Sequence, residues 1–306
     1  MPQAAIAFGG NLGPVIDQFR AAIARLAAAG VVVELASALY ETGPVGSVAT
    51  GRYVNAAAVV STPLAPAELL RTLLETETAL GRERTELWGP RPLDLDLIWY
   101  GEVVCETARL TLPHPACWYR RFVLDPLCDI CPAWTHPLKG VSIESLLTRF
   151  ERRPLGVGLA GGTERHRRRL VEIHRHSPTS RVDILDVHDD YQTSFTDAVR
   201  YVVPDVHAEI SFRHLGADVP AVIAWLGPSV GPLDETPTKS PAARPQSEST
   251  DPEFLALPMD RRLDVSRLAL CDDHWLLHLV QSISDAPRRI GGTEWAQCYQ
   301  KHASQS

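Results

Sequence analysis

Two aspartates, Asp94 and Asp96, alternate with leucines in the segment LDLDLIWY at residues 93–100. Alternation with a period of two is typical of a β-strand, so both carboxylates should lie on one face and the leucines in the core. Neighbouring carboxylates repel each other unless a cation neutralises them, and Mg²⁺ is commonly held by one or two carboxylates together with substrate phosphates. The pair therefore indicates a magnesium site, although a solvated acidic pair on an edge strand is the simpler interpretation of this motif taken alone.

Arginines just upstream favour the magnesium site. Arg82 and Arg84 lie in the segment GRER at residues 81–84, and Arg91 ends the segment WGPR at residues 88–91. A guanidinium pairs with phosphate oxygens through two parallel hydrogen bonds, so these arginines and the carboxylates share a polyphosphate as their common target. A single loop arginine is more often a solvated surface charge. Together the residues predict a metal-dependent site for a polyphosphate substrate.

Hydrophobic periodicity predicts the elements that position these residues. Strands are expected at residues 4–8, 31–40, 53–62 and 93–100, and helices at residues 15–29, 66–80 and 120–129. The order β-α-β-β-α-β is that of a ferredoxin-like split βαβ sandwich, which is an α+β fold. A chain of 306 residues suits two domains, and we place the first at residues 1–150.

The second half, residues 151–306, is expected to form an accessory α/β domain of unknown type, with a flexible segment rich in Pro, Ser and Thr at residues 228–253. The segment GVGLAGGT at residues 156–163 has the glycine and threonine spacing of a phosphate-binding loop, but Gly162 stands where the lysine should be. A plain glycine-rich turn is favoured, with a degenerate nucleotide site as the alternative. The last fifteen or so residues of the chain are expected to fray.

The composition bounds the class of protein. A net charge of −7 argues against a non-specific nucleic-acid binder, which would need a basic surface. Every segment falls short of the roughly 20 uninterrupted apolar residues of a membrane-spanning helix, and no secretory signal is seen. The scattered cysteines are interpreted as reduced thiols, with Cys128 and Cys131 as small core residues. We therefore expect a cytoplasmic protein that binds neither nucleic acid nor membrane.

From about Ile6 to Pro132 the sequence resembles the 6-hydroxymethyl-7,8-dihydropterin pyrophosphokinase family. The resemblance rests on segments in the family's order: GGNLG at 9–13, YETGPVG at 40–46, YVNAA at 53–57, GRER at 81–84, WGPRPLDLDLIWYG at 88–101, LPHP at 112–115 and RRFVLDPL at 120–127. WGPR followed by DLDL is the most specific part. The resemblance implies an ATP-dependent diphosphotransferase that transfers pyrophosphate from ATP to 6-hydroxymethyl-7,8-dihydropterin, giving AMP and the pterin diphosphate, in folate biosynthesis.

The resemblance also implies roles for individual residues. Asp94 and Asp96 would hold two Mg²⁺ ions, and Arg82 and Arg91 would act with them in catalysis. A helix residue, Glu77, would support the site. ATP would be bound by Arg84, Trp88, Leu97, His114 and Arg120, with Trp88 as a lid. The pterin would be bound by Thr42, Gly43, Pro44, Val45, Tyr53, Asn55 and Phe122, with Asn55 reading its polar edge and Tyr53 and Phe122 stacking on its ring.

The sequence departs from the family pattern in a loop between Arg84 and Trp88 that is one residue short, in the segment ACWYR at 116–120, where polar and basic residues are usual, and at two single positions. Leu74 stands where a glutamine near the adenine is expected, and Leu87 stands where another arginine is common. These changes bear on nucleotide affinity and lid closure rather than on the reaction type. The alternative function is a catalytically weak family member that acts as a binding or scaffold protein. The expected ligands are ATP, the pterin and Mg²⁺, and no protein partner is implied.

Overall fold

The computed structural model describes residues 1–43, 51–82, 91–152, 155–175, 182–186, 222–226, 262–264, 279–280 and 282–297. The chain divides into two compact units. The first comprises Met1–Pro137, Val141–Thr148 and Gln281–Ser306, and the second comprises Leu138–Gly140 and Arg149–Val280. The end of the chain therefore returns to the first unit, which differs from the expected single division at residue 150.

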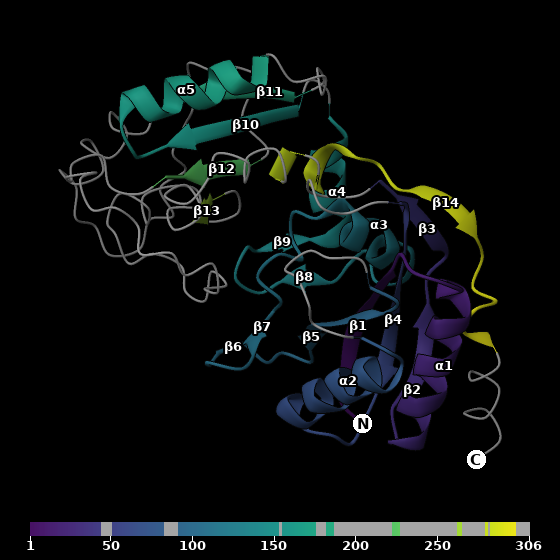
Figure 1. Ribbon diagram of the computed structural model, residues 1–306. Coiled ribbons are helices and arrows are strands. Elements are labelled where there is room, and N and C mark those ends of the chain that lie inside the picture. The colour runs from purple at the N-terminus through teal and green to yellow at the C-terminus, as the bar shows by residue number, and fades with distance from the viewer. Residues whose placement is uncertain are drawn as a thin grey trace. The chain divides into compact units, whose positions relative to one another are not determined.

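A six-stranded antiparallel sheet forms the centre of the first unit (Figure 1). Its strands are β1 (Gln3–Gly10), β2 (Val32–Ala36), β3 (Leu39–Thr42), β4 (Tyr53–Ser61), β5 (Asp94–Tyr100) and β14 (Arg288–Gly291). The order is β14-β3-β4-β1-β5, and β2 also pairs with β4. The helical connections from β1 to β2 and from β4 to β5 each skip one strand, as in a split βαβ arrangement. The predicted α+β class is confirmed.

Two helices, α1 (Val15–Ala28) and α2 (Pro66–Ala79), lie on one face of this sheet (Figure 1). On α1, Phe19, Ile23 and Leu26 recur at helical spacing and are buried. The first turn of α2 begins with proline, whose missing N–H has no helical partner in any case. The apolar stripes of both helices pack against the alternate side chains of the strands to form one hydrophobic core.

A third helix, α3 (Arg121–Ile130), packs against β3 and β4. Its Asp129 accepts hydrogen bonds from the Tyr40 hydroxyl and from the Ala38 N–H, both at 3.0 Å. The Ser37 hydroxyl accepts the Ala57 N–H at 2.9 Å. The Ala38 and Ala57 N–H groups thus bond to side chains rather than across the strands, and the strand expected over residues 31–40 is two strands, β2 and β3.

The C-terminal segment, defined here as residues 282–297, is built into the first unit. Its strand β14 pairs with β3, and Trp295 is 1% exposed within the hydrophobic core. The Trp295 ring lies edge-on to Phe8 and Phe19, with centroid separations of 5.0 and 5.7 Å. The expectation of fraying is therefore wrong for residues 292–297, because an aromatic anchor holds them; residues 298–306 lie outside the described part.

Short elements complete the first unit and lead out of it. They are the strand pairs β6 (Cys105–Glu106) with β7 (Thr111–Leu112) and β8 (Thr135–His136) with β9 (Val141–Ser142), and the helix α4 (Ile143–Glu151). Cys128 and Cys131 are of intermediate burial rather than fully buried core residues. Burial is still sufficient to raise the pKa of the Cys131 thiol to about 12.

The second unit contains a four-stranded parallel sheet in the order β11-β10-β12-β13. The strands are β10 (Leu155–Ala160), β11 (Val182–Asp186), β12 (Val222–Trp225) and β13 (Arg262–Asp264), and the helix α5 (Glu164–Arg175) follows β10. Gly161 and Gly162 have φ angles of 67° and 62° and form the turn into α5, where Arg167 donates to both of their carbonyls at 2.9 and 3.1 Å. The expected flexible segment at residues 228–253 lies outside the described residues.

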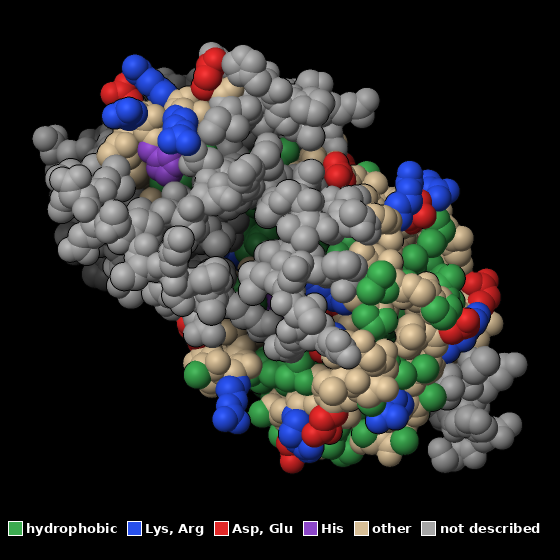
Figure 2. Space-filling view, viewed as in Figure 1, with side chains coloured by type: hydrophobic (Ala, Val, Ile, Leu, Met, Phe, Trp, Pro, Cys, Tyr) green, Lys and Arg blue, Asp and Glu red, His purple; other side chains and the backbone are tan. Residues whose placement is uncertain are grey.

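The described surface carries charges of both signs. On the face seen in Figure 2, Lys and Arg side chains alternate with Asp and Glu side chains among hydrophobic ones. Across the described ranges, none of the helices combines the length and apolar character that crossing a membrane requires.

Candidate active site

A row of aligned residues crosses the sheet on the face opposite α1 and α2. Strand register places Asp94 opposite Gly9, Gly9 opposite Asn55, and Asn55 opposite Tyr40. Directly paired residues of antiparallel strands share a face, and neighbouring strands lie about 4.8 Å apart. The carboxylate of Asp94 and the amide of Asn55 therefore start from positions about 10 Å apart. Gly9 lies between them and has no side chain, so no side chain rises from the sheet at this point.

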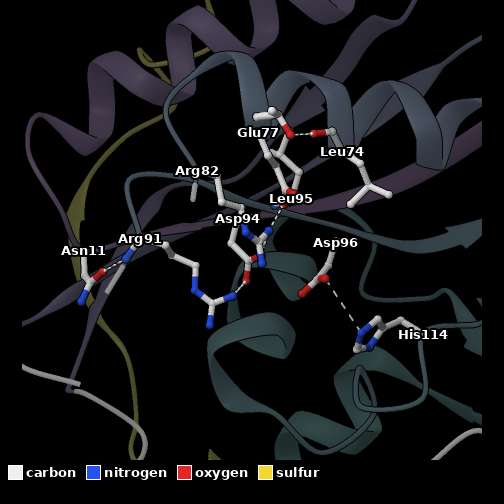
Figure 3. A network of polar contacts seen from close by, with 10 residues as sticks. Asn11, Leu74, Glu77, Arg82, Arg91, Asp94, Leu95, Asp96 and His114 are labelled. Atoms are coloured by element: carbon white, nitrogen blue, oxygen red, sulfur yellow. Dashed lines mark hydrogen bonds and ion pairs between the residues drawn. The ribbon is translucent and has the colours of Figure 1, made fainter. Parts of the chain in front are cut away.

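The predicted pair of aspartates lies as expected. Asp94 and Asp96 project to the same side of β5, while Leu95 and Leu97 are buried in the core on the other side (Figure 3). The aspartate side chains are 26% and 34% exposed, so both are accessible to a ligand.

Two of the predicted arginines converge on Asp94. Arg82 Nη1 donates to Asp94 Oδ1 at 2.6 Å, and Arg91 Nη1 donates to Asp94 Oδ2 at 2.9 Å (Figure 3). The arginine side chains are only 15% and 21% exposed. Each oxygen of this carboxylate thus accepts a hydrogen bond from a guanidinium group. We call Arg82, Arg91, Asp94 and Glu77 the charged cluster.

Glu77 of α2 supports this cluster from the helix. Its Oε1 accepts a hydrogen bond from Arg82 and another from the Leu95 N–H at 2.7 Å. The side chain is 2% exposed, and burial raises the pKa of Glu77 to about 7, while the Leu95 N–H and the Arg82 charge oppose this rise. Glu77 therefore links α2 to the start of β5 and holds Arg82 beside Asp94.

Asp96 faces His114 rather than an arginine. His114 Nε2 lies 4.0 Å from Asp96 Oδ1 (Figure 3). The His114 N–H donates to the Ile98 carbonyl at 2.8 Å, which ties the LPHP segment to β5. The Ala116 N–H donates to His114 Nδ1 at 3.2 Å. A ring nitrogen that accepts is unprotonated, so a neutral His114 carries its proton on Nε2 and presents a donor toward the carboxylates.

Asn55 and Thr42 form the polar end of the row. They are 5% and 8% exposed, and Asn55 Nδ2 donates to the Thr42 hydroxyl at 3.0 Å. Asn55 Oδ1 then points toward Gly9, where an added β-carbon would lie 3.7 Å from it. The Asn55 amide thus offers an acceptor on the same face as the aspartates.

Two aromatic side chains are contributed by β4 and by α3, which packs against β3 and β4. Tyr53 pairs with Thr42 in register, and burial raises its pKa, with Arg91 opposing the rise and Asp94 adding to it. Phe122 is the second residue of α3, and the guanidinium carbon of Arg120 lies 5.6 Å from its ring centroid. Tyr53 and Phe122 are both partly exposed. They are the aromatic surfaces of this face that a flat ligand could meet.

Two residues that sequence reasoning did not single out also shape the site. Asn11 Oδ1 accepts the Arg91 N–H at 2.8 Å, and the Asn11 N–H donates to the Arg91 carbonyl at 3.0 Å. A β-carbon on Gly10 would lie 2.6 Å from the Pro92 carbonyl oxygen, so only glycine permits this approach. The GGNLG segment could have suggested such a contact, because glycine allows two backbones to meet closely. Asn11 and Gly10 together fix the backbone that carries Arg91.

The remaining predicted residues are distributed as follows. Gly43 ends the described stretch after β3, and Leu97 has its side chain in the core, so it could meet a nucleotide only through its main chain. Leu74 lies on α2 and lines a hollow of about 350 Å³ with Arg71, Glu75, Thr78 and Ala79. Pro44, Val45, Arg84, Leu87 and Trp88 lie outside the described residues.

The charged cluster and the accessible aspartates fit a hard divalent cation. Both carboxylates point to one side, and Mg²⁺ accepts ligand sets of one or two carboxylates completed by phosphate oxygens. The arginines now bonded to Asp94 are the groups that would move to phosphate oxygens. The fold and the cluster thus define an α+β protein in which accessible carboxylates and guanidinium groups lie beside a hydrogen-bonding and aromatic face.

Comparison with known proteins agrees with this class. Residues 5–132 match the family model of 7,8-dihydro-6-hydroxymethylpterin-pyrophosphokinase. A Synechocystis protein named 2-amino-4-hydroxy-6-hydroxymethyldihydropteridine pyrophosphokinase is 46% identical over 149 residues, covering 48% of this chain and 76% of the relative. The Bacillus subtilis protein of the same name is 42% identical over 127 residues, covering 41% and 76%. The chain belongs to the 7,8-dihydro-6-hydroxymethylpterin-pyrophosphokinase family.

Larger relatives share only part of their length with this chain. The mitochondrial folate synthesis bifunctional protein of Arabidopsis thaliana is 42% identical over 125 residues, which are 41% of this chain and 23% of that protein. A triple mutant of Plasmodium falciparum HPPK-DHPS covers 73% of this chain and 63% of its own, with 12% identity and a TM-score of 0.39. A score this low does not establish a shared fold.

Proposed function

We propose that the charged cluster and the aligned row carry out the reaction of the family at this site. As a family member, the chain is an ATP-dependent diphosphotransferase, which transfers pyrophosphate from ATP to 6-hydroxymethyl-7,8-dihydropterin in folate biosynthesis. The single observation that carries the assignment of residues is the placement of Asp94 and Asp96 on one face of β5, with Arg82 and Arg91 bonded to Asp94. The substrates fit the expected cytoplasmic location.

The phosphate end of the site would be built from the charged cluster. Asp94 and Asp96 would hold Mg²⁺, and two ions are expected from the family resemblance. When bound, the metal neutralises phosphate charge and orients the group that is transferred. Arg82 and Arg91 would exchange the Asp94 carboxylate for phosphate oxygens, while Glu77 keeps Arg82 in reach. Catalysis would then rest on positioning and charge stabilisation.

His114 and Arg120 would complete the nucleotide contacts. The Nε2 proton of His114 faces the aspartates and could donate to a phosphate oxygen that arrives between them. Arg120 precedes α3 and would add a further guanidinium. Arg84 and Trp88 are assigned to ATP by the family resemblance alone.

The pterin would lie over the opposite end of the row. Asn55 Oδ1 would accept a ring N–H, because the bond from Nδ2 to the Thr42 hydroxyl turns Oδ1 toward Gly9 on this face. Tyr53 and Phe122 would contact the faces of the ring, and the backbone after Thr42 would meet its edge. The pterin hydroxyl oxygen would then attack the β-phosphorus of ATP, and AMP would leave.

Two substitutions test the proposal in an AMP-release assay with ATP, the pterin and Mg²⁺. Asp94→Asn and Asp96→Asn each keep the size of the side chain but remove the charge that holds the metal. Each should lower kcat by about 100-fold or more. Asp17→Asn is the matched control, because Asp17 is a 67% exposed aspartate on α1 whose ion-pair partner is Arg20.

The outcomes separate the candidate functions. AMP formation by the wild-type protein that requires Mg²⁺ and is lost in both variants would support the proposal. A folded wild-type protein that binds the pterin and forms no AMP would instead support a binding protein. Variants that retain full activity would show that the metal is held elsewhere.

A further inference from the structure

The C-terminal segment lies far from the family match in sequence but within the unit that carries the site. Residues 5–132 match the family model, whereas this segment begins at residue 282, after the residues of the second unit. Trp295 anchors the segment: its ring packs on Phe8 and Phe19, and its Nε1 donates to the Ser37 carbonyl at 2.9 Å. The segment is therefore an added element of the site-bearing unit with a firm attachment.

Strand β14 then runs along the outer edge of β3, the strand that ends at Thr42. Arg288 pairs with Glu41 in register, and Arg289 pairs with Tyr40. A β-carbon on Gly43 would lie 4.0 Å from Asp285 Oδ2, so the residue that follows Thr42 also faces this segment. Both sides of Thr42 in the chain thus have a neighbour from residues 282–297.

The Glu41 carboxylate joins three strands at this point. Its Oε1 accepts a hydrogen bond from Arg288 at 2.6 Å and another from Arg52 at 2.6 Å. Arg52 stands directly before β4, whose first residue, Tyr53, pairs with Thr42. The Glu41 side chain is 17% exposed although both arginines are largely exposed, and the hydrogen bond from Arg288 contributes most to lowering the pKa of Glu41. Glu41 is thus held ionised between β14 and the start of β4.

We propose that Arg288 is a positioning residue for the pterin, which rests on the proposed function of this site. By holding Glu41, Arg288 fixes the end of β3 so that the Thr42 hydroxyl keeps the Asn55 amide in the orientation that presents Oδ1 to the ligand. Arg288 touches no substrate; it acts through Glu41 and Thr42. The C-terminal segment is accordingly part of the pterin side of the site and not of its nucleotide side.

A double-mutant cycle in the full-length chain tests this. The variants are Arg288→Ala, Glu41→Gln and the double variant, and the readouts are KM for the pterin, KM for ATP, and the Kd of the pterin measured by calorimetry with Mg²⁺ and a non-hydrolysable ATP analogue. Arg288→Ala should raise KM and Kd for the pterin about three- to fivefold, as expected for losing one well-formed ion pair, and Glu41→Gln, which also loses the pair with Arg52, should raise them at least as much. KM for ATP should be unchanged in both variants. Because Arg288 acts through Glu41, adding Arg288→Ala to Glu41→Gln should cause no further rise, and the double variant should resemble Glu41→Gln.

Two further variants serve as controls. Arg288→Lys keeps a donor for Glu41 and should restore most of the pterin affinity. Arg20→Ala removes another exposed ion pair, that with Asp17 at 2.8 Å, and should leave both KM values unchanged. Unchanged pterin affinity in Arg288→Ala, an equal rise of both KM values, or effects that multiply in the double variant would each overturn the inference. If the wild-type protein forms no AMP, the proposed function is overturned, but the calorimetric Kd values still decide the role of Arg288. If the wild-type protein does not bind the pterin, both proposals are overturned.

Discussion

Replacing Trp295 with alanine should destabilise the unit that carries the site, although the residue lies near the end of the chain. The side chain is 1% exposed, its ring centroid is 5.0 Å from Phe8 and 5.7 Å from Phe19, and its N–H satisfies the Ser37 carbonyl. Truncating a buried Trp to Ala costs about 3–5 kcal/mol through lost burial and the cavity that remains. For a unit of this size, each kcal/mol lowers Tm by about 2–4 °C, so a drop of about 6–20 °C is expected.

Trp295→Phe separates packing from hydrogen bonding at the same position. The smaller ring would still meet Phe8 and Phe19, but the buried Ser37 carbonyl would lose its donor, which costs about 1–3 kcal/mol. Gln297→Ala is the matched control, because Gln297 is an exposed residue of the same segment. The expected order of stability is wild type and Gln297→Ala together, then Trp295→Phe, then Trp295→Ala.

The assay must report on the correct unit. Thermal unfolding can be followed by circular dichroism, and the transition that Mg²⁺ with an ATP analogue shifts upward belongs to the unit that binds the nucleotide. The Trp295→Ala change should appear in that transition. A shift of less than about 1 kcal/mol, or a shift confined to the other transition, would refute the view that the C-terminal segment belongs to the core of the site-bearing unit.

Two further predictions concern the charged cluster and the backbone beside it. Burial raises the pKa of Glu77 from 4.5 to about 7, so folding favours its neutral form. This preference contributes its full stabilisation below pH 4.5, and the contribution is lost as the pH rises to about 7. The free energy of unfolding of the wild type, measured with urea, should therefore fall by up to about 3 kcal/mol over this range relative to Glu77→Gln, which stays neutral. A difference between the two proteins that does not change with pH would contradict the raised pKa. Gly10→Ala would place a β-carbon 2.6 Å from the Pro92 carbonyl oxygen and should cost about 1–3 kcal/mol with a large loss of activity. Gly9→Ala meets its nearest neighbours at 3.7 and 3.8 Å and should keep its stability, so equal destabilisation of both variants would disprove the close approach.

The sequence by itself determined the local features of this protein. The period-two alternation of Asp94 and Asp96 with leucines is enough to predict which side chains share a face, because strand geometry depends on neighbouring residues only. Helical spacing in the same way predicted α1 and α2. The motif WGPR followed by DLDL was specific enough to indicate the family.

The tertiary structure alone decided which distant residues meet. Alignment of Asp94 with Gly9 and Asn55 depends on strand register, and the position of Glu77 beneath Arg82 depends on how α2 packs on β5. The return of Trp295 to the core was hidden because one aromatic residue in an irregular segment carries no periodic signal. Contacts between residues far apart in sequence follow from the packing of complete elements, which local patterns do not specify.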